Sequence, residues 1–231
     1  MSQALLYGLI VSTPLVLGPL IGSRVKLPKH LVAVILAFAA GTFISALAFD
    51  LFSEAFNQGG LVLASIGFLT GAAGYILFNV VVARRKRSAA ETGGLLLFAG
   101  AAIDGIPENI ALGTTLATGE PSLALLMAIV ISNFPEGLVS SEELREGGKS
   151  TMFTLGLWFI TALLLVFFVP LGQLLGSLGG GYLPLIQSFA AGAVLGLIAD
   201  GMLPQAYKQG GPWVAFSTAA GFLLAFMLTK L

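Results

Sequence analysis

The sequence predicts an all-α membrane protein with eight transmembrane helices in a 3+2+3 arrangement that contains inverted repeats. Of its 231 residues, 57% are hydrophobic and 10% are charged, and the mean hydropathy is +0.97. Soluble domains carry roughly 25% charged residues, so this chain has too few charges to cover a water-exposed globule. Apolar runs of about 20 residues, the length that crosses a bilayer, recur along the chain. A formal net charge of zero argues against nucleic-acid binding, and the lack of cysteine excludes disulfides and cysteine-ligated zinc.

Polar residues, glycine and proline divide the apolar sequence into eight runs. The predicted spans are Ala4–Ser23, Leu31–Leu51, Leu61–Ala83, Gly94–Ala117, Ser122–Ser141, Met152–Leu174, Leu183–Ala206 and Trp213–Thr229. We expect a single transporter domain over residues 1–231, with three spans in residues 4–83, two in 94–141 and three in 152–229. No basic residue precedes the first span and no small-x-small cleavage site follows it, so we interpret it as a retained helix.

The basic residues predict the orientation of the chain in the membrane. Ten of the eleven fall in loops on one side, and only Lys230 falls on the other. The ten are Arg24, Lys26, Lys29, Arg84, Arg85, Lys86, Arg87, Arg145, Lys149 and Lys208. The positive-inside rule assigns that side to the cytoplasm, which places both termini outside a plasma (inner) membrane. The run Arg84–Arg87 is expected to contact lipid headgroups.

Two pairs of segments resemble each other. Ala39-Ala40-Gly41 precedes Asp50 in span two, and Ala190-Ala191-Gly192 precedes Asp200 in span seven. The sequence IDGIPEN in span four matches ISNFPEG in span five. Because the members of each pair cross in opposite directions, they predict an inverted-topology repeat, which is common in secondary transporters. Spans 1–3 would correspond to spans 6–8, with spans 4 and 5 between them.

Acidic residues inside apolar helices are the strongest functional signal. Asp104 and Glu108 share a face of span four, and Asn133 and Glu136 share a face of span five. Each pair flanks a proline, which frees a backbone carbonyl of the preceding turn. A charge at the bilayer centre costs on the order of 3 kcal/mol. No lysine, arginine or histidine lies inside the spans apart from the terminal Lys230, so bound protons or a bound metal ion must neutralise the acids.

The predicted metal ligands are therefore Asp104, Glu108, Asn133 and Glu136, and all of them offer oxygen. Oxygen sets suit hard divalent ions such as Mg²⁺, Mn²⁺ or Ca²⁺. Carboxylates also bind Zn²⁺ and Fe²⁺, so the sequence leaves the metal open. The only histidine, His30, falls in a predicted cytoplasmic loop.

The motifs Ile-Pro-Glu-Asn and Phe-Pro-Glu-Gly resemble the paired Pro-Glu motifs of the ZIP (Zrt/Irt-like) divalent metal transporters. The resemblance extends over essentially the whole chain, in span number, outward termini and 3+2+3 organisation. It implies transport of a divalent metal as substrate, with Glu108 and Glu136 as shared ligands. Asp104 stands where many members have a metal-binding histidine, and Ser132 and Asn133 occupy polar ligand positions. The loss of histidine makes a one-metal site the expectation and leaves a zinc preference open.

Three further acids are candidates for entrance and exit positions along the ion path. Asp50 and Glu54 lie toward the outer end of span two, and Asp200 lies toward the inner end of span seven. An intramembrane aspartyl or metal-dependent hydrolase is the alternative class, although no His-Glu-x-x-His motif or nucleophile beside a base supports an enzyme. A relative that binds metal without moving it is a third reading, and the sequence also leaves a homodimer open.

Overall fold

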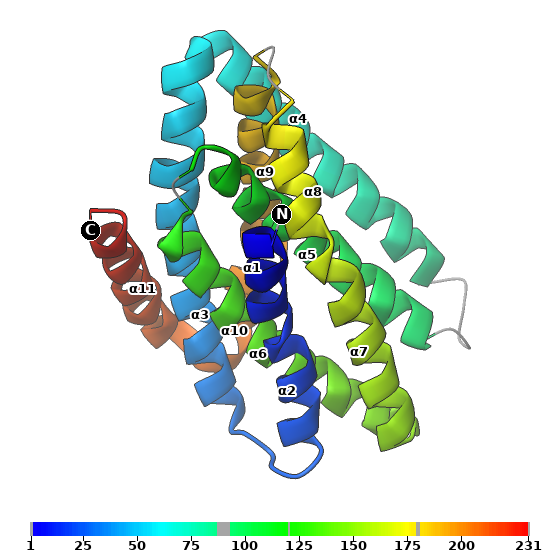
Figure 1. The fold of residues 1–231 in the computed structure, drawn as a ribbon. Coiled ribbons are helices and arrows are strands. Elements are labelled where there is room, and N and C mark those ends of the chain that lie inside the picture. The colour runs from blue at the N-terminus through cyan, green and yellow to red at the C-terminus, as the bar shows by residue number, and fades with distance from the viewer. Residues whose placement is uncertain (1, 87–92, 120, 179–180, 231) are drawn as a thin grey trace.

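The computed structural model describes residues 2–86, 93–119, 121–178 and 181–230. Within these ranges the side chains at 82–97, Glu143 and Glu146 are not among the described ones. Within these ranges every regular element is helical, and no strand occurs (Figure 1). The basic run Arg84–Arg87 falls outside the described side chains. The elements are α1 (Ser2–Ser12), α2 (Pro14–Gly22), α3 (Lys29–Ala46), η1 (Leu47–Phe52), α4 (Ser53–Lys86), α5 (Gly93–Ala117), α6 (Leu123–Glu146), α7 (Thr151–Val166), α8 (Phe168–Gly176), α9 (Tyr182–Leu197), η2 (Ile198–Met202), α10 (Leu203–Gly210), η3 (Gly211–Trp213) and α11 (Val214–Leu228).

Several helical stretches are long and apolar enough to cross a membrane, so the chain has the character of an integral membrane protein. Five occur among the described residues: Ser2–Gly22, Lys29–Val81, Leu123–Glu142, Thr151–Gly176 and Tyr182–Leu228. Two of them, at 53 and 47 residues, are more than twice the length that a bilayer needs. The helix α5 is 25 residues long, carries two acids, and is not one of the five.

Each of the two longest stretches reverses direction at a glycine. Gly60, inside α4, has a φ of 73°, and Gly211, between α10 and α11, has a φ of 66°. Only glycine adopts this left-handed region without strain. In Figure 1 the first reversal forms the upper end of the molecule, while the connections from α2 to α3 and from α6 to α7 lie at the lower end. The helix that contains Asp50 therefore continues past Leu51, the predicted end of span two, until it reaches Gly60.

Two other stretches are broken near their middle in similar ways. The chain passes from α1 to α2 at Thr13, directly before Pro14, whose ring removes a backbone donor. It passes from α7 to α8 at Phe167. The segments behind the breaks read PLVLGPLIG and FVPLGQLLG, with Gly18 and Gly172 in the same place.

Two π-helical segments also interrupt long helices, and each carries an aspartate. The segment η1 contains Asp50, and η2 contains Asp200. Turns of π-helix are rare and often lie at functional sites. The two aspartates that follow similar Ala-Ala-Gly segments in the sequence thus have the same kind of local backbone.

Close glycine contacts hold α3 against α11 and α9 against α4. A methyl group built on Gly41 of α3 would lie 1.9 Å from the carbonyl oxygen of Thr218 in α11. One built on Gly192 of α9 would lie 1.9 Å from the carbonyl oxygen of Phe68 in α4. Small residues allow helix backbones to approach this closely in membranes.

The helices that carry the Pro-Glu motifs, α5 and α6, pack in the same manner. A methyl group on Gly18 of α2 would lie 2.5 Å from the carbonyl oxygen of Phe134 in α6. One on Gly172 of α8 would lie 2.3 Å from the carbonyl oxygen of Ile110 in α5. The broken stretches α1–α2 and α7–α8 are therefore the immediate neighbours of the two candidate site helices.

Candidate functional site

A cavity of about 240 Å³ lies between α3, α5, α6, α7 and the end of α9 with η2 and α10. It brings together three of the four predicted metal ligands, Asp104, Glu108 and Glu136, with Ser132 beside them. Gln205 of α10, which is not among the predicted ligands, also lines it. Its other lining residues are Val32, Leu36, Gly100, Ala101, Pro135, Val139, Ser140, Trp158, Leu197, Gly201 and Met202.

The lining is acidic and contains no lysine, arginine or histidine among the described residues. Glu108 is only 3% exposed, and Glu136 is half-buried. Carboxylates gathered in a medium of low dielectric constant repel one another, and burying them without a cation is unfavourable. The cavity therefore favours a visiting cation.

The donor set is dominated by oxygen. Carboxylates, the Ser132 hydroxyl and the Gln205 amide face one space, and the thioether of Met202 is the one soft atom in the described lining. Over the described parts of the chain, no three acidic or histidine side chains come together in a way that could hold a metal ion. In this conformation an ion would thus share the cavity with water, and its contacts to the protein would be incomplete.

Asn133, the fourth predicted ligand, is directed elsewhere. Its side-chain amide donates a hydrogen bond of 2.7 Å to the backbone carbonyl of Val11 in α1, and the residue is 2% exposed. It does not line the cavity. Ser132 takes the neighbouring place on the lining and donates to the Ile129 carbonyl of its own helix at 3.1 Å.

A second pocket adjoins the cavity on the side of the α2–α3 connection. It shares Val32 and Val139 with the cavity and is lined by Lys26, Lys29 and Glu142. Its position beside the α2–α3 connection places it at the end that holds the predicted cytoplasmic loops.

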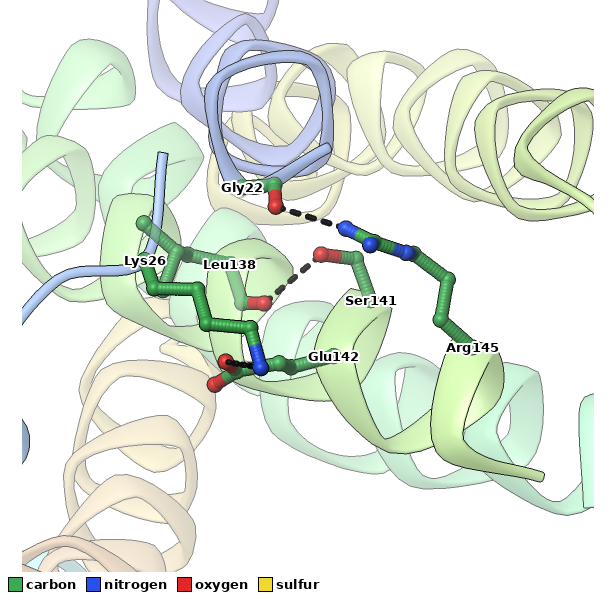
Figure 2. Close-up of polar contacts among 6 residues, drawn as sticks. All are labelled: Gly22, Lys26, Leu138, Ser141, Glu142 and Arg145. Atoms are coloured by element: carbon green, nitrogen blue, oxygen red, sulfur yellow. Dashed lines mark hydrogen bonds and ion pairs between the residues drawn. The ribbon is translucent and has the colours of Figure 1, made fainter. Parts of the chain in front are cut away.

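Polar contacts beside this second pocket join α6 to the end of α2 and to the α2–α3 connection. Figure 2 shows Arg145 donating to the Gly22 carbonyl, at 2.9 Å, and Lys26 facing Glu142, at 3.9 Å. Lys26 is exposed and Glu142 is partly exposed, so the attraction between them is weak. The second pocket is therefore lined by side chains of both charges, the positive Lys26 and Lys29 and the negative Glu142.

The opposite end of the cavity is closed by apolar packing. On α3, η1, α5 and α6, the residues between the cavity and the far end include Phe43, Leu47, Leu112, Leu125 and Ile129, which are at most 4% exposed. This layer belongs to the main hydrophobic core. The cavity therefore adjoins a pocket toward one end of the bundle, and buried apolar residues separate it from the pocket toward the other end.

Beyond the apolar layer lies a polar pocket of about 610 Å³ that contains Asp50 and Glu54. The hydroxyl of Ser122 donates to Asp50, and Gln58 donates to Glu54 at 2.5 Å. Thr229 also lies within hydrogen-bonding reach of Asp50. The structure thus brings these two predicted entrance residues together, apart from the central cavity.

Asp200, the predicted exit residue, does not line the cavity either. It accepts a hydrogen bond from Asn79 of α4, and both residues line a shallow pocket of about 480 Å³ with Ile76 and Val80. Its neighbour on η2, Gly201, is the one that faces the central cavity.

Comparison with known proteins adds no assignment. No protein-family model matches the chain, and no curated protein matches it. The fold and the cavity define the chain at the level of an all-helical membrane protein with an acidic central site.

Proposed function

We propose that this protein transports divalent metal cations across a membrane through the central cavity, as a member of the ZIP-like class. The observation that carries the proposal is the buried acidic lining, in which Glu108 and Glu136 face one space with no basic residue among the described lining residues. An intramembrane acid without a basic partner is a functional site by default. A divalent cation is the ligand that neutralises two carboxylates at once.

We further propose that the chain crosses the membrane eight times in a 3+2+3 arrangement. The reversals at Gly60 and Gly211 would each divide a long stretch into two crossings, and α5 would add another. Inverted repeats are supported by the matched helix pairs. Gly41 of α3, in span two, contacts α11, which carries span eight. Gly192 of α9, in span seven, contacts α4, which carries span three. This is the pairing expected if spans 2 and 3 correspond to spans 7 and 8.

The proposed direction of transport is toward the cytoplasm. The cavity shares Val32 and Val139 with the pocket at Lys26 and Lys29, at the end that the positive-inside rule assigns to the cytoplasm of a plasma membrane. The apolar layer at Leu112 and Leu125 separates it from the outer pocket at Asp50. This conformation would release an ion inward, and movement of one helix group against the other would open the outer side.

Uptake into liposomes tests the proposal. The purified protein should accumulate Mn²⁺ or Zn²⁺ in sealed vesicles, and Glu108→Gln should abolish the accumulation because it removes a buried charged ligand. Glu142→Gln is the matched control, since Glu142 is an acid of α6 that lines the second pocket, with Lys26 and Lys29, and not the central cavity. Equal uptake by wild type and Glu108→Gln would reject the site. Binding without uptake would reject transport and leave a metal-binding protein.

A further inference from the structure

We infer that Asn109 and Asn133 are a matched pair of positioning residues, each of which anchors a site helix to the break in a neighbouring broken helix. Asn133 would then act through its N–H group on Val11 and not as a metal ligand. The inference rests on the proposed function, because it concerns how the carboxylates of that same site are held.

The two hydrogen bonds are alike in length, burial and target. Asn133 of α6 donates to the carbonyl of Val11 at 2.7 Å, and Asn109 of α5 donates to the carbonyl of Leu165 at 2.9 Å. Both asparagines are at most 2% exposed. A buried hydrogen bond of this kind is costly to break, because the carbonyl that remains has no water to replace the donor.

The two acceptor carbonyls, of Val11 and Leu165, lie at equivalent positions in the two broken helices. Val11 lies just before the α1–α2 break, and Leu165 lies just before the α7–α8 break. Val11 precedes Gly18 by the same interval that separates Leu165 from Gly172, and both glycines contact a site helix. Carbonyls in the last turn of a helix lose their regular partners, and at Val11 and Leu165 an asparagine side chain supplies a donor.

The asparagines sit where they can control the carboxylates. Asn109 follows Glu108 directly, and Asn133 is adjacent to Ser132 and three residues before Glu136. Anchoring each asparagine limits the rotation of its helix about its own axis, and that rotation decides whether the acids face the cavity. Hydrogen-bond partners outside the ligand shell orient ligands in this way, and their loss weakens metal affinity by about 10- to 100-fold.

The substitution Asn133→Asp separates positioning from ligation by the sign of its effect. A ligand at this position would gain a charge, so Mn²⁺ would bind more tightly. A positioning residue would lose its N–H donor and turn a carboxylate oxygen toward the Val11 carbonyl oxygen. We expect Mn²⁺ binding to the purified full chain, followed by the paramagnetic resonance signal of free Mn²⁺, to weaken about 10- to 100-fold.

Asn109→Asp is the matched variant, because Asn109 does not line the cavity and makes the equivalent bond. It should weaken binding to a similar degree. Should the aspartate variants fail to fold, Asn109→Leu carries the comparison, because it should weaken binding and change the resonance line shape of bound Mn²⁺ at saturation only if Asn109 positions the site. Asn133→Leu should weaken binding under either reading and serves as its reference. Tighter binding by Asn133→Asp, or an effect confined to the Asn133 variants, would overturn the inference. Failure of the wild type to bind Mn²⁺ or another divalent ion would reject the proposed function itself.

Discussion

The contact between Gly41 and α11 yields a quantitative prediction for the substitution Gly41→Ala. The added methyl carbon would lie 1.9 Å from the carbonyl oxygen of Thr218, whereas carbon and oxygen in comparable contacts are about 3.3 Å apart or more. The two helices would therefore have to separate by about 1.4 Å, which is the difference between these distances. Overpacking of this kind destabilises proteins by 1–3 kcal/mol, and we expect about 2 kcal/mol.

Gly156 of α7 offers a matched control. A methyl group built there meets nothing within 4 Å, so Gly156→Ala should be neutral or should stabilise the helix by up to about 1 kcal/mol. Thermal unfolding in detergent can be followed by the fluorescence of Trp158 and Trp213. For a chain of this length, about 2 kcal/mol corresponds to a loss of roughly 4 to 8 °C in Tm for Gly41→Ala. If both variants unfold at the same temperature, the close approach of α3 and α11 is refuted.

Three further predictions follow from local features. Gly60→Ala should lower stability by about 1–3 kcal/mol through the backbone conformation alone (φ 73°, ψ 173°), because no atom lies within 4 Å of the added carbon. A Tm equal to that of the wild type would contradict the reversal. Ser122→Ala should lower the free energy of unfolding by about 1–2 kcal/mol, because Ser122 caps α6 through the N–H of Leu125 at 2.9 Å and also donates to Asp50. The same thermal unfolding experiment measures this loss, and an unchanged Tm would contradict the capping role. Mn²⁺ affinity should fall as pH falls, since protons compete with the metal for the carboxylates, and titrations at neutral and acidic pH that agree would argue against carboxylate ligation.

The helical character and the identity of the acidic helices could be predicted from the sequence, because they follow from apolar runs and from residue spacing. The two helix breaks were not predicted, although a proline lies near each of them: Pro14 directly follows Thr13, and Pro170 lies three residues after Phe167. The π-helical turns at Asp50 and Asp200 have no comparable signal in the sequence, because the extra residue in such a turn is accommodated by packing and not by local propensity.

Helical spacing alone does not predict which polar side chain of α6 faces the cavity. Residues four apart differ by about 40° around a helix and residues three apart by about 60° on the other side. Asp104 and Glu108 are four apart, and the structure adds Ser132, four before Glu136, to the same cavity. Asn133 lies on the other flank and reaches Val11 instead. Spacing placed Asn133 near the site and the family resemblance added Ser132, but only the neighbouring helices decide which of them faces the cavity.

The size of the central cavity bears on how an ion would be handled there. A volume of about 240 Å³ is many times the roughly 10–15 Å³ that one water molecule needs, so the cavity has room for several. A divalent ion could then keep much of its hydration shell while the acids supply charge from the walls. Magnesium, which sheds water reluctantly, would meet little extra barrier, and departure would require the exchange of a few solvent molecules and not the stripping of a dry cage.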